Sequence, residues 1–113
     1  MEIQTDTLSD VPVIRLSGRL DMKGTQEAES DFNKNAADSG QSIIVDLSGV
    51  SYIASIGIRL FLTNIKQLSA KGKRMVILRP QKMVEEVFKL AGVDSIIPIE
   101  HDDNAAVEAV KGA

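Results

Sequence analysis

The residues whose types and spacing could support chemistry begin at Ser55. Residues 54–58 have the sequence Ala-Ser-Ile-Gly-Ile and open a stretch in which apolar residues recur every three or four positions, which predicts the first turn of an amphipathic helix. Serine is a favoured helix cap, because its hydroxyl accepts a hydrogen bond from a backbone N–H two or three residues on. Gly57 is a poorer helix former than alanine, but it would let another backbone or an anion come close.

The same position also suits a phosphate group. A phosphate at a helix N-terminus meets unpaired N–H groups and the positive end of the helix dipole, and phosphorylation adds nearly two negative charges. Modification of Ser55 could therefore change the binding of a partner without refolding the domain. The sequence leaves two interpretations open, in which Ser55 is either an ordinary cap or a site of regulatory modification.

Other groups that commonly carry chemistry are sparse. The chain has no cysteine and a single histidine, His101, beside Asp102 and Asp103, and one imidazole cannot complete a zinc site. Neither the Gly-x-Ser-x-Gly sequence of hydrolases nor a glycine-rich phosphate loop occurs. We therefore expect no catalytic residue, no metal and no cofactor, and we expect His101 to be an ordinary surface group. The alternative from a different class is a small nucleotide-binding or hydrolytic enzyme that uses the helix start as an anion site.

The elements that would position Ser55 follow from the patterns of apolar and turn residues. Strands are predicted over residues 2–7, 11–16, 42–47, 74–79 and 96–99, and the first two form a hairpin. Residues 17–21 are predicted as a turn, and a helix should follow each strand from the second to the fifth, the last of them over residues 103–111. Met75 and Met83 fall on apolar stripes and are predicted to be core residues.

Two of the predicted strands indicate the architecture. Residues 42–47 and 74–79 are nearly continuous runs of apolar, often β-branched residues, which are typical of parallel strands covered on both faces. Strands and helices alternate along most of the chain, as they do in α/β proteins. We therefore predict a single α/β domain over residues 1–113, with a mixed, mostly parallel sheet of about five strands and about four covering helices.

Composition and charge narrow the possible partners. The chain has 113 residues, of which 43% are hydrophobic and 26% charged, as is typical of a globular domain. Its formal net charge of -3 argues against general affinity for nucleic acid or for an anionic membrane. The N-terminal residues lack the pattern of a signal peptide, and no apolar run approaches the roughly 18 residues of a membrane-spanning helix. We expect a cytoplasmic protein with no membrane insertion and no nucleic-acid partner, and the sequence does not predict its oligomeric state.

Three stretches of the sequence resemble one known family in their order and spacing. Residues 18–21 (Gly-Arg-Leu-Asp) resemble its Gly-x-Leu-Asp turn, and residues 43–50 resemble its central strand with an Asp-Leu-Ser ending. Ser55-x-Gly57 resembles its Asp-Ser-Ser/Thr-Gly phosphorylation motif. The sequence thus resembles, nearly end to end, the STAS family, which includes anti-sigma factor antagonists and domains of sulphate transporters.

The resemblance implies a regulatory protein-binding module and not an enzyme. An unphosphorylated antagonist of this type binds an anti-sigma factor that is also a serine kinase, and so frees a sigma factor or another target. The kinase uses ATP to phosphorylate the first serine of the motif, which is Ser55 here, and a PP2C-type phosphatase reverses the reaction. The strand ends and the helix start should lie along one edge, so the expected partner-binding residues are Asp21, Ser48, Gly49, Ser55, Ile56, Gly57 and Arg59.

The sequence departs from the family motif at two positions. The aspartate that usually precedes the serine is Ala54 here, and the second serine or threonine is Ile56. Loss of the carboxylate could alter recognition by a kinase, whereas an exposed Ile56 could favour permanent docking through apolar contact. The alternative is therefore a STAS subunit that is not phosphorylated and that docks constitutively in a transporter-associated or signalling complex.

Overall fold

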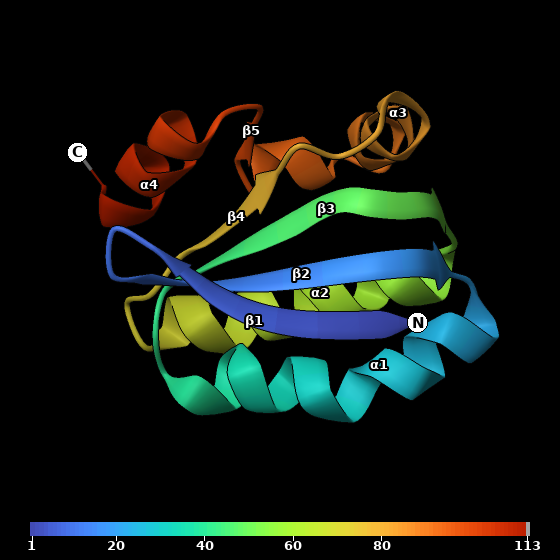
Figure 1. Ribbon diagram of the computed structural model, residues 1–113, viewed down its shortest axis with the longest axis horizontal. Coiled ribbons are helices and arrows are strands. Elements are labelled where there is room, and N and C mark those ends of the chain that lie inside the picture. The colour runs from blue at the N-terminus through green and yellow to red at the C-terminus, as the bar shows by residue number, and fades with distance from the viewer. Residues whose placement is uncertain (113) are drawn as a thin grey trace.

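Five strands form one sheet in the order β1-β2-β3-β4-β5 (Figure 1). The computed structural model describes residues 1–112. β1 runs antiparallel to β2, and the other neighbouring pairs are parallel, so the prediction of a mixed, mostly parallel sheet is confirmed. The strands are β1 (Glu2–Leu8), β2 (Val11–Leu20), β3 (Ile43–Ile53), β4 (Met75–Leu78) and β5 (Ile99–Glu100).

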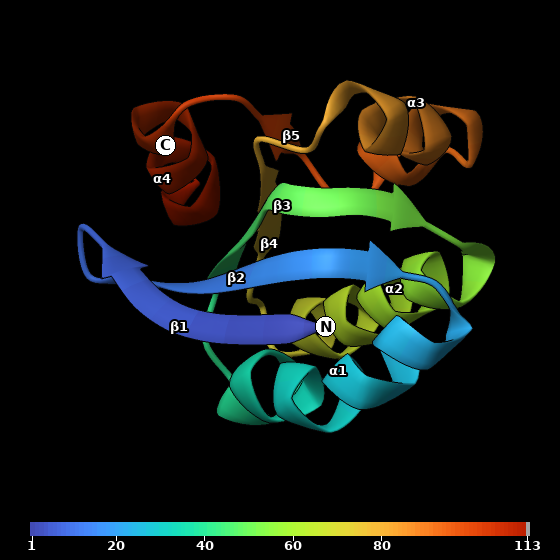
Figure 2. The ribbon, with the colours of Figure 1, turned by 45° about the vertical axis from the view of Figure 1, so that its right-hand side comes forward.

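Within residues 1–112, four α-helices accompany the sheet, as predicted. α1 and α2 lie side by side against one face, whereas α4 packs on the other face (Figures 1 and 2). Two short 3-10 turns, at Ala37–Ser39 and Val93–Ser95, follow α1 and α3. The helices are α1 (Met22–Asn35), α2 (Ser55–Ala70), α3 (Lys82–Leu90) and α4 (Asp103–Lys111).

The central strands are covered on both faces, as their apolar sequences predicted. Residues 43–47, at the start of β3, are all buried. On the face covered by α1 and α2, the rings of Phe32, Phe61 and Phe88 follow one another with centroids 5.3 and 6.0 Å apart and connect α1, α2 and α3. A smaller apolar cluster lies on the opposite face, where α4 contributes Val110. The sheet therefore separates two apolar clusters of unequal size.

β2 and β3 extend further than the sequence predicted. The expected turn at residues 17–21 is wrong, because β2 continues to Leu20, and β3 runs on to Ile53. The two extensions pair with each other, and the pairing shifts twice so that β3 holds an extra residue each time. Gly18, with φ at 120°, adopts a conformation that other residues rarely tolerate. The glycine and small polar residues therefore belong to an irregular strand and not to a turn.

One predicted core residue lies on the surface of α3. Met75 is fully buried as predicted, but Met83 is 63% exposed, so its prediction as a core residue is wrong. Val84 and Phe88, four residues apart, face the core, and this places Met83 on the outer side of the helix. The apolar stripe of α3 is thus narrower than the sequence indicated.

The last strand lies at the edge of the sheet, as predicted, but it is shorter than expected. Residues 96–99 were expected to form it, whereas β5 contains only Ile99 and Glu100. The N–H of Ile97 donates to Val93 O at 2.8 Å, so the chain is still turning at this point. Pro98 has no N–H to donate, but its carbonyl accepts from the N–H of Ile77 at 2.9 Å, and the strand begins at the next residue.

Candidate functional site

Ser55 is an exposed residue at the start of α2. It is the first residue of the helix, and Ala54 occupies the cap position with φ -100° and ψ 172°. Alanine has no hydrogen-bonding side chain, so α2 begins without a side-chain cap. The interpretation of Ser55 as the cap is therefore wrong, and its hydroxyl does not serve that purpose.

The first turn of α2 leaves backbone donors beside the Ser55 hydroxyl. The N–H groups of Gly57 and Ile58 both donate to Ala54 O, at 3.0 and 3.2 Å. The N–H groups of Ser55 and Ile56 precede these bonds and have no acceptor within the helix. Together with the helix dipole, they make this end of α2 favourable for a negative group.

Gly57 lets the start of α2 lie close to the ends of two strands. A Cβ at this position would lie 2.9 Å from Ile53 Cγ1 and 3.1 Å from Leu20 Cβ, which is too close for a side chain without displacement of its neighbours. The N–H of Ala54 also donates to Leu20 O at 2.9 Å. A glycine here was expected to allow the close approach of either another backbone segment or an anion. The structure shows the approach of another chain segment.

Asp21 lies at the same rim of the sheet, between β2 and α1. Its Oδ1 accepts a hydrogen bond from the N–H of Gly24 at 2.8 Å and caps α1. Asp21 and Ala54 are the single residues that join β2 to α1 and β3 to α2. Because Ala54 bonds to the last residue of β2, the structure brings Asp21 close to Ser55.

Ile56 and Arg59 extend this site along α2. Arg59 is exposed one helical turn after Ser55, and Ile56 is half-buried. Both line a groove between α1 and α2. The structure therefore brings five of the predicted residues together at this rim, four of them at least partly exposed and Gly57 buried beneath them. We call this set the rim surface: Asp21, Ser55, Ile56, Gly57 and Arg59.

Three side chains that the sequence reasoning missed border the rim surface. The guanidinium carbon of Arg19 lies 4.4 Å from the ring centroid of Tyr52, and Arg19 Nε lies 3.7 Å from Asp21 Oδ2. Met22, the first residue of α1, is 65% exposed. Two features of the sequence could have pointed to these residues. Tyr52 is the only tyrosine of the chain, and Met22 directly follows the Gly-x-Leu-Asp stretch at residues 18–21.

Ser48 and Gly49 lie elsewhere on the sheet. Both are exposed in β3, five and four residues before its last residue, which corresponds to roughly 13–16 Å along a strand. The N–H of Ser48 donates to Asp46 Oδ1, and Gln81 Nε2 donates to Ser48 O, both at 2.9 Å. The structure does not bring these two residues into the rim surface, and their part in partner binding stays a prediction.

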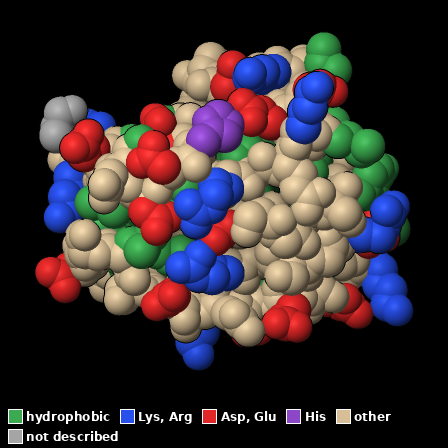
Figure 3. Space-filling view, turned by 45° about the horizontal axis from the view of Figure 1, so that its top comes forward, with side chains coloured by type: hydrophobic (Ala, Val, Ile, Leu, Met, Phe, Trp, Pro, Cys, Tyr) green, Lys and Arg blue, Asp and Glu red, His purple; other side chains and the backbone are tan. Residues whose placement is uncertain are grey.

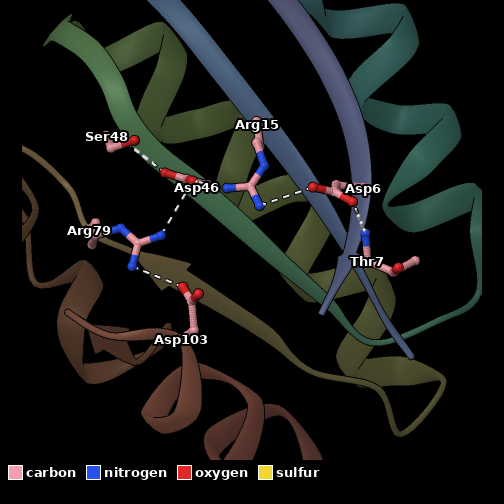
Figure 4. A network of polar contacts seen from close by, with 7 residues as sticks. All are labelled: Asp6, Thr7, Arg15, Asp46, Ser48, Arg79 and Asp103. Atoms are coloured by element: carbon pink, nitrogen blue, oxygen red, sulfur yellow. Dashed lines mark hydrogen bonds and ion pairs between the residues drawn. The ribbon is translucent and has the colours of Figure 1, made fainter. Parts of the chain in front are cut away.

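A row of alternating charges crosses the sheet beside Ser48 (Figure 4). Asp6, Arg15, Asp46, Arg79 and Asp103 follow one another from β1 to α4, and each arginine pairs with the acid on either side. Asp46 is 4% exposed, whereas the outer members of the row are exposed. The pKa of Asp6 lies below its ordinary value because a backbone N–H and then the Arg15 side chain donate to its carboxylate. The row connects three strands, the residue that follows β4 and the start of α4 by charge-assisted contacts.

The histidine belongs to a different contact. His101, the purple side chain in Figure 3, is exposed, and its Nε2 lies 2.7 Å from Glu85 Oε1 of α3. This contact, followed by that of Lys89, holds the pKa of Glu85 below its ordinary value. Within residues 1–112, no group of three histidine or acidic side chains could hold a metal ion. In the same range no helix has the length and apolar character needed to cross a membrane.

The site therefore offers an exposed hydroxyl, free backbone donors and a mixture of apolar and charged side chains at the rim of an α/β sheet. Such a surface can dock a protein or carry a phosphate group, and its scaffold is that of a small α/β domain. The STAS domain family model matches residues 2–106, and the chain belongs to this family.

Relatives and solved structures agree with this assignment. The anti-sigma-B factor antagonist of Staphylococcus aureus is 26% identical over 99 residues, which cover 88% of this chain and 92% of that protein. An anti-sigma factor antagonist from Mycobacterium paratuberculosis has a similar structure, with a TM-score of 0.85, 22% identity and coverage of 97% and 93% of the two chains. Unphosphorylated SpoIIAA, an anti-sigma factor antagonist, superimposes with a TM-score of 0.77, 24% identity and coverage of 99% and 98%.

Proposed function

We propose that this chain is an anti-sigma factor antagonist that binds an anti-sigma factor through the rim surface. Its family and the names of its relatives support this function. The observation that carries the proposal is Ser55, an exposed hydroxyl at the start of α2 that does not cap its helix. The chain then acts in the cytoplasm as a binding module and a kinase substrate, not as an enzyme.

In this proposal the partner is also a serine kinase, and Ser55 is the switch. Ser55 Oγ attacks the γ-phosphorus of ATP, ADP leaves, and the hydroxyl proton passes to a base of the kinase. A PP2C-type phosphatase hydrolyses the phosphoester and returns the serine hydroxyl and inorganic phosphate. Only the unphosphorylated form binds the anti-sigma factor tightly.

The local geometry supports a switch that needs no refolding. A phosphate on Ser55 would lie beside the free N–H groups of Ser55 and Ile56, with the Arg59 guanidinium one turn away. These donors favour the modified helix start, so the fold is retained. The surface that meets the partner gains nearly two negative charges next to Asp21, and this change in charge opposes docking.

The test compares variants of Ser55 in binding to the anti-sigma factor kinase of the same organism by calorimetry. Ser55→Ala should bind like the wild type, and Ser55→Asp should bind at least about tenfold more weakly. Ser30→Asp is the matched control, because Ser30 is an exposed serine of α1, and it should retain wild-type affinity. Equal affinity of all the variants would contradict the switch.

Mass spectrometry tests the modification itself. The kinase with ATP should add one phosphate to the wild type and none to Ser55→Ala. Subsequent treatment with the phosphatase should remove it. A phosphate that appears equally in Ser55→Ala would assign the modification to another residue.

A second candidate keeps the docking surface and removes the switch. Ala54 and Ile56 replace the polar residues of the family motif, and Ile56 adds apolar surface beside Ser55. In this case the chain docks constitutively as a STAS subunit of a transporter-associated or signalling complex. Co-purification with a partner that ATP does not release, together with the absence of phosphate on Ser55 in cells, would favour this candidate.

A further inference from the structure

The groove between α1 and α2 opens beside the rim surface. Its volume is about 190 Å³, equal to the liquid volume of about six water molecules. Sites for drug-sized ligands usually span roughly 300–1,000 Å³, so this groove suits a smaller molecule. The side chains that matter for its chemistry are Thr25, Glu29 and Asn33 of α1 and Ile56, Arg59 and Leu60 of α2.

The groove carries one charge of each sign. Glu29 is exposed on α1 and Arg59 is exposed on α2, and both line the groove. Among residues 1–112, neither of them forms an ion pair with another side chain. A guanidinium binds a carboxylate through two parallel hydrogen bonds, and a carboxylate accepts hydrogen bonds from an ammonium. The two walls of the groove thus present complementary partners for a molecule that carries both charges.

The wall of the groove also contains polar groups. Thr25 is 2% exposed, and in the described part of the chain its hydroxyl oxygen is buried without a hydrogen-bond partner. Buried polar side chains in native proteins are nearly always satisfied, and this hydroxyl, whose oxygen has no surface open to the groove, is an exception that lies behind the wall. Asn33 Oδ1 accepts a hydrogen bond from Asn64 Nδ2 at 2.8 Å, which leaves the Asn33 amide nitrogen as a donor.

We propose that this groove binds a small zwitterion of the size of a free α-amino acid. Its carboxylate pairs with Arg59, its ammonium group pairs with Glu29, and its side chain contacts Ile56 and Leu60. The Asn33 amide nitrogen supplies a hydrogen bond at the wall. The inference goes beyond the proposed function, because it requires neither modification of Ser55 nor a partner protein.

The test is a titration of the isotope-labelled full chain with each standard α-amino acid in turn, followed through the backbone amide signals. At least one amino acid should move the signals of Glu29, Ile56 and Arg59 at concentrations up to about 10 mM. Acetate and methylammonium each carry half of the charge pattern, and each should bind at least about tenfold more weakly than the amino acid.

Charge-neutral variants then assign the contacts. Glu29→Gln and Arg59→Gln should each weaken the binding of the amino acid at least about tenfold. Glu86→Gln and Lys82→Gln are matched controls, because both positions are exposed on α3 and lie outside the groove, and both should keep wild-type affinity. All four positions are exposed, so the variants should fold, and thermal melting verifies it.

Three results would overturn the proposal. The first is the absence of any shift in the backbone amide signals with every amino acid. The second is a set of shifts that is the same in the wild type and in both groove variants. The third is acetate binding as strong as that of the amino acid, which would define a simple anion site on Arg59. None of these results bears on the Ser55 variants, so failure here is distinguishable from failure of the proposed function.

Discussion

Removal of the Asp46 carboxylate should destabilise the fold more than removal of an exposed acid, because Asp46 is the buried centre of the charge row. Its side chain is 5% exposed. It accepts a hydrogen bond from the N–H of Ser48 at 2.9 Å, and it pairs with Arg15 and, at 3.9 Å, with Arg79. Asp46→Ala removes all of these contacts at once. Asp46→Asn keeps an acceptor for Ser48 and removes only the charge.

The magnitude follows from these contacts. A hydrogen bond to a charged group contributes roughly 1.5–3 kcal/mol, which is the loss expected at the N–H of Ser48. The Arg15 side chain is 31% exposed and keeps its ion pair with Asp6 in the variant. Solvent screening therefore limits the stabilisation lost with the Arg15–Asp46 ion pair to about 1 kcal/mol. Arg79 is 39% exposed and its contact is long, so it adds little. Asp46→Ala should therefore reduce the free energy of unfolding by about 3 kcal/mol, and Asp46→Asn by about half of that.

Urea denaturation followed by circular dichroism measures the loss of stability in both variants. The slope of the free energy of unfolding against urea concentration should stay unchanged. Asp31→Ala removes an exposed acid of α1 and serves as the control, with an expected change within about 0.5 kcal/mol. A loss below about 1 kcal/mol for Asp46→Ala would refute the reasoning. So would an Asp46→Asn variant as unstable as Asp46→Ala, since the Ser48 contact would then contribute nothing.

Two further predictions concern α1 and α3. A Cβ on Gly24 would lie 1.9 Å from Arg19 O, which is too close without a shift of the backbone. Gly24→Ala should therefore lower the free energy of unfolding by about 2–3 kcal/mol, although alanine favours helices more than glycine does. An unchanged midpoint of urea denaturation would contradict this prediction. The pKa of Glu85 lies below its ordinary value in the folded state because His101 bonds to its carboxylate. The ionised form therefore stabilises the fold above the ordinary pKa, and this stabilisation is lost as the pH falls through the lower pKa of the folded state. Glu85→Gln should therefore lose less stability than the wild type between about pH 6 and pH 3, and an equal loss in stability measured by urea denaturation would count against this contact.

The sequence predicted the layers of the fold better than the lengths of the central strands. Apart from Asp46, residues 43–47 are apolar, and three of them are β-branched. Such a run is a local sign of burial on both faces. Beyond Leu47 the sequence is small and polar, and β3 continues there because β2 pairs with it. That pairing depends on residues about thirty positions away in the chain, and no local pattern reports it.

In the candidate site, too, local features could be predicted from the sequence and long-range contacts could not. Ser55 was found because a serine and a glycine at the start of a periodic stretch are visible locally. Its predicted role as a cap was wrong because the cap is set by the end of β3, which extends to the residue before Ala54. The charge row could not be predicted at all, since it joins residues from position 6 to position 103 through the order of the strands.

The one-residue connections at Asp21 and Ala54 have a consequence for the thermodynamics of docking. The rim surface has no flexible loop on either side of Ser55, because each strand passes into its helix through one residue held by backbone hydrogen bonds. Ordering of a mobile loop opposes association in many interfaces. In the proposed docking, the ordering of these two connections would be a cost of folding and not of association. A partner would meet a surface whose shape is the same before and after the encounter, and discrimination between partners would rest on charge and side-chain fit.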